Sequence, residues 1–394
     1  MKRFLNIIII FLLIHSHVLA QDQTTEGEKE TIKQAKKEQR AAKKAEKIEM
    51  GKFMISPLAA PGYTPELGAL FAIGGLASFK TTPSDQTLQR SSLPFTLAYT
   101  TTGAFTANAI LTSYWFGDKF RMNVDLWYKD MPDNYWGVGY DNGVNVTVSD
   151  STTAYNRQWF LINPRILWQF RQNYFVGLIL DVNYTKGTEA SQGVMEDPFY
   201  EQYNDMPLNT GLGFILRYDS RDFPVNAWKG MLVDLKATFY STAFGGDNTY
   251  QIYLLDLRKY QQILRRGSTL AFQIKSRVGI GEVPYGEMSQ IGTPYDLRGY
   301  TWGRFRDRSM LYFLGEWRHV FEKKNEELSK HGAVLWVGAG TIFEQTDLDE
   351  TNMKWLPNFG FGYRFEVQPR MNIRLDVGVG RETYGIYFNF VEAF

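Results

Sequence analysis

The stretch that decides the fold is Met371–Gly380, with the sequence MNIRLDVGVG. Its residues alternate in polarity with a period of two, which is the period of a β-strand. The apolar face carries Met371, Ile373, Leu375, Val377 and Val379. The opposite face carries Asn372, Arg374, Asp376, Gly378 and Gly380. In a soluble sandwich the apolar face points inward, whereas in a membrane barrel it faces lipid and the polar face lines the lumen.

Similar alternation recurs along most of the chain. Aromatic residues make up 15% of the sequence, there are 35 glycines, and no later stretch is apolar for long enough to form a membrane-spanning helix. These features predict an all-β, transmembrane, antiparallel β-barrel of about 16 strands over residues 51–394. The predicted strands start near Lys52, Leu67, Leu93, Ala104, Lys119, Tyr155, Tyr174, Leu208, Gly230, Tyr250, Ser268, Ser309, Gly332, Pro357, Met371 and Tyr384.

The N-terminal residues follow a different pattern. Lys2 and Arg3 precede an apolar run, and small residues stand before Gln21, so residues 1–20 are predicted to be a signal peptide for export. Residues 21–50 contain no aromatic residue and are rich in Lys, Glu, Gln and Ala. We expect a charged, partly helical periplasmic extension, with contact to lipid head groups or a partner as the alternative.

The spacing of turn residues predicts the connections. Tight turns are expected at Gly117–Asp118 and Arg266–Gly267. Longer polar stretches predict extracellular loops at Lys80–Ser92, Lys186–Pro207 and Glu282–Arg308. The last strand is expected to place Ile386, Phe388, Phe390 and Phe394 on one apolar face.

Several classes of function find no support in the residues. The net charge of +1 argues against a nucleic-acid binder. Two of the four histidines lie within the predicted signal peptide, and there is no cysteine, so neither a metal site nor another cofactor is expected. Because no phosphate-binding loop or nucleophile motif is present, we do not expect an enzyme.

The segment Ser289–Arg308 is at once glycine-rich, basic and aromatic. Its core, Leu297-Arg298-Gly299-Tyr300, resembles the (Val/Leu)-Arg-Gly-(Phe/Tyr) motif of the BamA/TamA-type surface-antigen family. Residues 310–318 (MLYFLGEWR), 217–222 (RYDSRD) and 358–394 resemble further strands of that family, in the same order. The resemblance implies that the motif lies at the tip of the sixth extracellular loop, which folds back into the barrel.

The chemistry of Arg298 suggests its partners. A guanidinium offers five donors in a fixed fork that suits a carboxylate, and Glu316 lies on the predicted lumenal face of the next strand. The resemblance implies an inward Arg–Glu pair, but the family's further acidic position falls at Gly338 in this chain. Asp376 is the substitute that a later strand offers. The alternative is that these charges only line a wet lumen, where such pairs contribute little.

A second candidate site is the seam where the first strand meets the last. The first strand, Phe53 to Ala60, is expected to be short and contains Pro57, which has no N–H group for the sheet ladder. Gly385 in the last strand is expected to permit a bend, and Phe394 is expected to close that strand. A weakly paired seam offers its edge to an incoming strand. The alternative is that Pro57 only marks a ragged strand start.

Together, the residues and the resemblance predict a barrel in the outer membrane of a Gram-negative bacterium that helps to insert or translocate envelope proteins. Expected partners are outer-membrane lipids, client barrel proteins, and periplasmic or outer-membrane subunits that deliver clients. Family members carry periplasmic POTRA domains, whereas residues 21–50 are too short for one, so general assembly by the usual route is in doubt. The alternatives are a channel gated by the inward loop and a barrel that anchors a complex.

Overall fold

The computed structural model describes residues 31–36, 38–39, 42–43, 46, 50–64, 68–344 and 354–394. The chain divides into two compact units, Met1–Met54 and Ile55–Phe394. In the first unit, residues 31–36 are helical. The predicted signal peptide and most of the predicted charged extension lie outside the described residues. No helix in the described part of the chain is long and apolar enough to cross a membrane.

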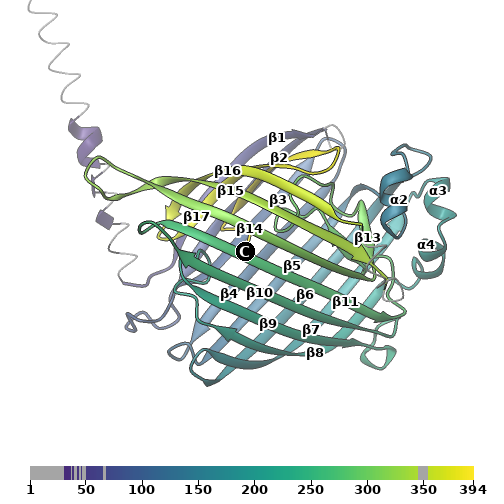
Figure 1. The fold of residues 1–394 in the computed structure, drawn as a ribbon, viewed down its shortest axis with the longest axis horizontal. Helices are drawn as coiled ribbons and strands as arrows, with labels where there is room; N and C mark the ends of the chain where they lie inside the picture. The colour runs from purple at the N-terminus through teal and green to yellow at the C-terminus, as the bar shows by residue number, and fades with distance from the viewer. Residues whose placement is uncertain are drawn as a thin grey trace, which may run out of the picture. The chain divides into compact units, whose positions relative to one another are not determined.

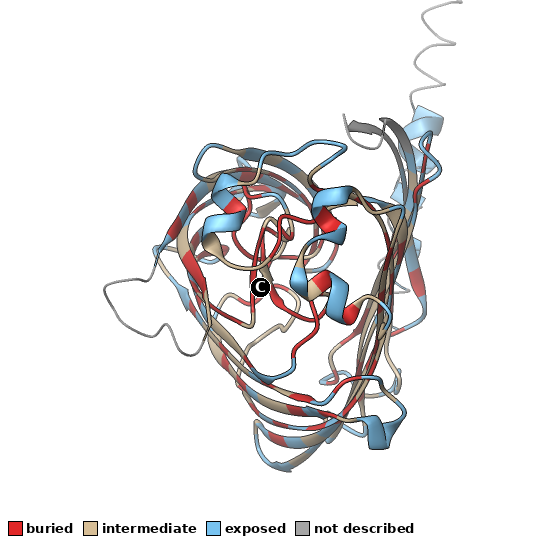
Figure 2. Cartoon of the chain, turned by 90° about the vertical axis from the view of Figure 1, so that its right-hand side faces the viewer, coloured by how far each residue is buried: buried red, intermediate tan, exposed pale blue. Residues whose placement is uncertain are grey.

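The second unit is built on one antiparallel sheet of 16 strands, in which neighbours along the chain are neighbours in space (Figure 1). The strands are β1 (Met54–Thr64), β2 (Gly68–Phe79), β3 (Ser91–Thr100), β4 (Phe105–Trp115), β5 (Phe120–Asn134), β6 (Ala154–Arg171), β7 (Tyr174–Thr188), β8 (Leu208–Asp219), β9 (Gly230–Tyr240), β10 (Tyr250–Gln262), β11 (Ser268–Gly281), β14 (Ser309–Glu322), β15 (Leu328–Phe343), β16 (Leu356–Gln368), β17 (Met371–Val379) and β18 (Tyr384–Phe390). The sheet curves into a barrel, as the end-on view shows (Figure 2). The predicted all-β barrel and its strand number are confirmed.

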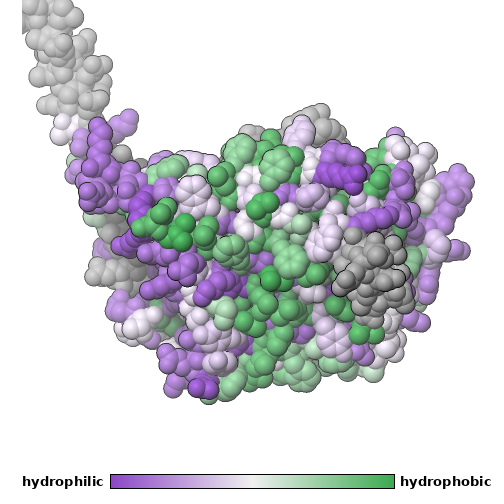
Figure 3. Space-filling model, in the orientation of Figure 1, coloured by the Kyte–Doolittle hydropathy of each residue, from purple (hydrophilic) through white to green (hydrophobic). Residues whose placement is uncertain are grey.

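The two faces of the sheet have the polarity of a membrane barrel. In β17, Arg374 and Asp376 are fully buried on the lumenal side, whereas Leu375 between them is 45% exposed. The same inversion recurs around the barrel, and apolar side chains cover much of the strand surface that Figure 3 displays. Because lipid solvates the outer face and polar groups pair inside, alternating sequences such as MNIRLDVGVG fold in this orientation.

The two ends of the barrel differ. At one end, here called the turn end, short connections join β4 to β5, β6 to β7, β14 to β15 and β16 to β17. The other end, the helical end, carries α2 (Tyr140–Asn145), α3 (Gln192–Met195), α4 (Pro198–Tyr203) and the 3-10 helix η1 (Thr242–Phe244). Figure 2 looks onto the helices α2, α3 and α4 at this end.

This division corrects two of the predicted loops. The connection after β2 runs over residues 80–90 at the turn end, opposite the connections that follow β7 and β11, so the three predicted extracellular loops do not all lie on one side of the membrane. Ser91 and Ser92 already belong to β3. The loop predicted from Lys186 starts later, because β7 continues to Thr188. The predicted loop Glu282–Arg308 is present at the helical end and contains two short strands, β12 (Ser289–Ile291) and β13 (Phe305–Asp307).

The predicted strand starts agree with the structure within about the usual boundary error. The largest difference is at β15, which was predicted from Gly332 and begins at Leu328. A register shift between Val320 and Glu322 lets the β14–β15 hairpin continue beyond the alternating part of the sequence. The polar residues Ser329, Lys330 and His331 therefore extend the strand toward the turn end without alternating apolar residues.

The end of the last strand also departs from the expectation. β18 ends at Phe390, and Val391 has a φ of 59°, which turns the chain out of the strand. Phe394 is only 5% exposed and packs near Tyr260, so it does not continue the outward face of Ile386 and Phe388. Gly385, which is expected to permit a bend, is paired with Gly378 within the β17–β18 ladder.

We expect charge tolerance on the outer face to depend on depth in the bilayer. Leu235 lies near the middle of β9 and is 46% exposed, so Leu235→Arg should destabilise the barrel by about 2–4 kcal/mol. Gln251 faces the same side near the helical end of β10, and Gln251→Arg should cost only about 0–1 kcal/mol. Urea unfolding in lipid vesicles measures both values. Equal costs for the two variants would contradict the assigned membrane face.

Candidate functional site

The long loop between β11 and β14 enters the barrel. Its two short strands form a hairpin in which Ile291 pairs with Phe305, and the segment between them carries the motif Leu297-Arg298-Gly299-Tyr300. Leu297 and Arg298 have no exposed surface, and Tyr300 is 2% exposed. In Figure 2, buried segments of the chain cross the lumen that the strands enclose. We call residues 292–304 the loop tip.

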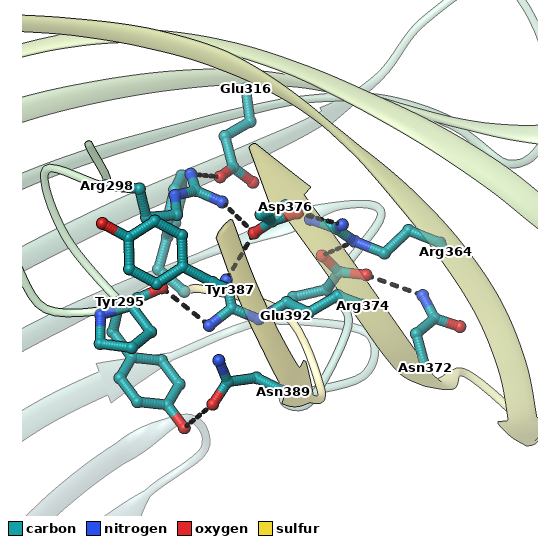
Figure 4. Close-up of polar contacts among 12 residues, drawn as sticks. Tyr295, Arg298, Glu316, Arg364, Asn372, Arg374, Asp376, Tyr387, Asn389 and Glu392 are labelled. Atoms are coloured by element: carbon teal, nitrogen blue, oxygen red, sulfur yellow. Dashed lines mark hydrogen bonds and ion pairs between the residues drawn. The ribbon is translucent and has the colours of Figure 1, made fainter. Parts of the chain in front are cut away.

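Arg298 is held by two carboxylates from different strands (Figure 4). Its Nη1 donates to Asp376 Oδ2 on β17 at 2.7 Å, and its Nη2 pairs with Glu316 on β14. The guanidinium also lies over the Trp336 ring of β15, 3.7 Å from the ring centroid. The structure therefore brings Arg298, Glu316 and Asp376 together, and Asp376 supplies the second carboxylate that Gly338 does not.

The two carboxylates are shared with other arginines. Asp376 also accepts from Arg364 and Arg374, and Glu316 accepts from Arg318 Nε at 2.8 Å. A third carboxylate, Glu392, accepts from Arg364 Nε at 2.8 Å. All members of this buried charge cluster are at most 5% exposed: Arg298, Glu316, Arg318, Arg364, Arg374, Asp376 and Glu392. Removing one partner of a buried ion pair typically costs about 3–5 kcal/mol, so the cluster fixes the loop position strongly.

Glycines on the lumenal face make room for the loop tip. Gly299 has a φ of +115°, and a Cβ there would lie 2.5 Å from the backbone of Val379 and Gly380. A Cβ on Gly378 would lie 2.6 Å from the carbonyl carbon and oxygen of Arg298, and one on Gly340 would lie 2.7 Å from Leu297. Since real Cβ atoms do not approach so closely, side chains at these positions would displace the tip. The glycines of the MNIRLDVGVG stretch therefore belong to the site.

Hydrogen bonds from the wall satisfy the backbone of the loop tip. The amide of Gly299 donates to Tyr387 Oη at 2.8 Å, and Asn358 Nδ2 donates to the Arg298 carbonyl at 3.0 Å. Tyr300 Oη donates to the Pro357 carbonyl at 2.6 Å and accepts from the amide of Arg381 at 3.0 Å. Because buried polar groups that lack a partner are costly, these bonds allow the loop backbone to remain inside the barrel.

A turn at Asp296 shapes the chain just before Arg298. Its carboxylate accepts from the amides of Gly292 and Thr293, both at 2.9 Å, and from the Thr293 hydroxyl at 2.6 Å. Burial raises the pKa of Asp296 above its ordinary value, although these hydrogen bonds act in the opposite direction. The turn thus fixes the direction in which Arg298 leaves the backbone.

A second contact holds the other side of the loop tip. Trp302 packs edge-on against Trp127 and Trp159, with ring centroids 6.3 and 6.0 Å apart. Lys129 Nζ lies 3.4 Å from the centroid of the Trp302 ring. Such cation–π contacts are strongest where the ammonium is shielded from water, and Lys129 is 8% exposed.

The seam between the first and last strands is closed by side chains at the turn end. In the part of the chain that the structure describes, β18 pairs only with β17, and the strand order does not return to β1. Gln368 at the end of β16 donates to Ser56 Oγ of β1 at 3.1 Å and to the Leu76 carbonyl of β2 at 2.9 Å. Leu76 also packs with Met371 and Phe390.

The predicted seam residues have different surroundings. Pro57 lies inside β1, which spans 11 residues, so the expectation of a short first strand is wrong. Phe53 is 59% exposed and precedes β1. Gly385 leaves room for the Tyr387 ring, since a Cβ there would lie 2.7 Å from Tyr387 Cζ. Phe394 lies in the lumen, where Arg318 Nη2 donates to its main-chain oxygen at 2.9 Å.

The buried charge cluster therefore joins the loop tip to the end of the chain by two routes. One runs from Arg298 through Glu316 and Arg318 to Phe394. The other runs from Arg298 through Asp376 and Arg364 to Glu392. No role is predicted from the sequence for Arg364, Glu392, Tyr387 or Trp336. Arg364 and Trp336 could have been predicted as lumenal residues, because they lie on the lumenal face of strands that the alternating sequence identifies.

This architecture defines an outer-membrane β-barrel whose longest loop is buried in its own lumen. The Omp85 superfamily domain matches residues 89–394, and the chain therefore belongs to the Omp85 superfamily. Membership in this family, together with the barrel, places the protein in the outer membrane of a Gram-negative bacterium. Comparison with curated protein sequences finds no match. Within the described residues, no group of three acidic, histidine or cysteine side chains is arranged to hold a metal ion.

Two solved structures are similar to this chain at low sequence identity. BamA from Haemophilus ducreyi lacking POTRA domains 1–3 is 15% identical, with a TM-score of 0.50 over 86% of this chain and 69% of that chain. CdiB from Acinetobacter baumannii is 11% identical, with a TM-score of 0.49 over 86% of this chain and 58% of that chain.

We expect Gly378→Ala to loosen the loop tip, because the added Cβ would meet the carbonyl of Arg298 at 2.6 Å. Overpacking of this kind costs about 1–3 kcal/mol, so tryptic cleavage after Arg298 or Arg304 should be at least about fivefold faster. Gly315→Ala is the matched control, since its nearest neighbour would lie at an ordinary 3.6 Å. Equal cleavage of the two variants would contradict the close approach of Gly378 to the loop.

Proposed function

We propose that this barrel helps to insert or translocate envelope proteins by opening laterally between β1 and β18. The observation that carries the proposal is the seam itself. There, a glutamine and a small apolar cluster take the place of a continuous ladder at the turn end. Side-chain contacts of this kind are easier to break than a row of backbone hydrogen bonds, and an open edge can pair with an incoming strand.

The buried charge cluster supports the proposal, because it connects the loop tip to the segment that follows β18. If the seam opens, β18 must move away from β1, and Glu392 and Phe394 would move with it. Release of Arg318 and Arg364 would then change the partners of Glu316 and Asp376, which hold Arg298. In this proposal, the position of the loop tip and the state of the seam depend on one another.

Export through the inner membrane by the predicted signal peptide belongs to the same proposal, as do the partners. The barrel would act without catalysis, in contact with outer-membrane lipids, client barrels and subunits that deliver those clients. The helical end would face outward, because long loops of bacterial barrels are extracellular and short turns periplasmic.

A cross-linked seam tests the proposal. The native chain has no cysteine, so Ser56→Cys with Gln368→Cys places the only two thiols at positions whose native side chains are hydrogen-bonded, with Gln368 Nε2 3.1 Å from Ser56 Oγ. In cells depleted of the native protein, the variant treated with a short, thiol-cleavable cross-linker should fail to restore folded outer-membrane barrels. Cleavage of the cross-link should restore them. Heat-modifiable migration and quantitative proteomics measure the barrels.

The control places the same cross-link within the ladder. Thr112 and Asn123 are directly opposed in the β4–β5 pair, and a bridge between cysteines there should not impair function. Depletion that leaves every other barrel unchanged would refute the assembly role. A large rise in conductance of the reconstituted protein when the loop tip is loosened would then favour the gated channel, and the absence of both effects would favour an anchoring barrel.

A further inference from the structure

The turn end of the barrel carries a cavity of about 560 Å³, here called the turn-end cavity. It lies between the turns that follow β8, β10 and β16 and the hairpin of β14 and β15. Its volume falls in the range of ligand-binding cavities. Six basic side chains line it: Arg266, Arg318, Lys323, Lys330, Arg364 and Arg370. The acidic side chains in the wall are Glu366 and Glu392. Arg318, Lys323, Arg364 and Arg370 pair with carboxylates, so the excess of positive charge comes from Arg266 and Lys330.

Two basic side chains at the rim of the turn-end cavity have no acidic partner among the described residues. Arg266 and Lys330 are exposed, and neither forms an ion pair with a carboxylate among the described residues. Arg266 lies 5.5 Å from the ring of Trp228, which also stacks with Arg370 at 3.8 Å. Concentrated charge of one sign in a concave wall attracts a ligand of the opposite sign.

The floor of the cavity holds arginines with unused donors. Arg318 is 5% exposed and Arg364 is 4% exposed. Within the described structure, Nη1 of Arg318 and Nη2 of Arg364 have no hydrogen-bond partner. Unpartnered guanidinium donors are costly, but these two atoms are themselves buried, so a ligand acceptor must displace neighbouring side chains to reach them.

The chain's own contacts indicate which acceptor fits. Glu392 lies on the floor, where its carboxylate accepts from Arg364 at 2.8 Å and from Asn372 at 2.7 Å. Arg318 binds a main-chain oxygen of the same segment, that of Phe394, at 2.9 Å. The cavity floor thus already binds one carboxylate and one main-chain oxygen of the chain's own residues 392–394. The basic groups of the rim are spread over several hairpins, which suits an extended ligand better than a single compact anion.

We propose that the turn-end cavity is a docking site for an acidic peptide segment of a partner protein, with Arg266 and Lys330 at its entrance and Arg318 and Arg364 at its floor. Arg318 and Arg364 also belong to the buried charge cluster, but binding here can be measured independently of the proposed seam activity, because it requires no client and no opening of the barrel. The partner is defined by its chemistry, an extended segment with several carboxylates.

The test uses the full chain in detergent micelles and a fluorescent ten-residue peptide of alternating Glu and Ser. Anisotropy should rise on binding, and a peptide with Gln in place of each Glu should not bind. Binding should weaken as salt screens the charges. Arg266→Gln with Lys330→Gln should lower the affinity between about threefold and tenfold, as expected for exposed charge contacts. Heat-modifiable migration verifies that each variant is folded.

The matched control is Lys119→Gln with Lys229→Gln, which removes two exposed lysines at the turn end that do not line the cavity. This pair should change the affinity by less than about twofold. Equal losses in both pairs, or equal binding of the Glu and Gln peptides, would overturn the site. Displacement of the peptide by inorganic phosphate or by anionic phospholipid vesicles at matched ionic strength would show a phosphate site instead. A failure of peptide binding leaves the cross-linking result at the seam unaffected, so the two proposals are judged separately.

Discussion

The contact of Arg298 with two carboxylates inside the lumen is the interaction on which the arrangement of this barrel depends. A charged loop inside a membrane protein is stable only if its charges are paired and its backbone is hydrogen-bonded. Glu316 and Asp376 meet the first requirement, and Tyr387 and Asn358 meet much of the second. The glycines of β15 and β17 add the space that the loop needs. The carboxylates, the hydrogen-bonding side chains and the glycines come from different strands of the barrel.

Buried ion pairs do not by themselves increase stability relative to apolar packing, because desolvation offsets most of the attraction. Their value here lies in position. An apolar loop tip would tolerate many placements in the lumen, whereas a guanidinium shared by two carboxylates tolerates very few. The same arginine–carboxylate chemistry continues to Arg364 and Glu392, so the end of β18 is fixed by the geometry that fixes the loop. This series of ion pairs physically links the proposed movement of the seam to the loop tip.

The sequence predicted the barrel well, because strand alternation is a local signal. Met371–Gly380 separates an apolar face from a polar face without any knowledge of its neighbours. Arg298, Glu316 and Asp376, which the sequence places on the loop and on two strands, meet in the structure. The segment after β18 could not be foreseen. Phe394 continues an apolar pattern in the sequence, but the positive φ of Val391 and the bond from Arg318 turn it into the lumen. Likewise, Lys80–Ser92 is polar and long, and polarity does not reveal at which end of a barrel a connection lies.

The most direct measurement of the central claim is a double-mutant cycle between Arg298 and Glu316, read by thiol labelling of a buried loop position. Leu297→Cys supplies the only thiol at a site with no exposed surface, so its labelling rate reports how often the loop tip leaves the lumen. Arg298→Gln and Glu316→Gln should each speed labelling, and the double variant should fall short of their summed effect by at least about 1 kcal/mol. Additive effects, or full protection of the thiol in Arg298→Gln, would contradict the claim that this ion pair holds the loop.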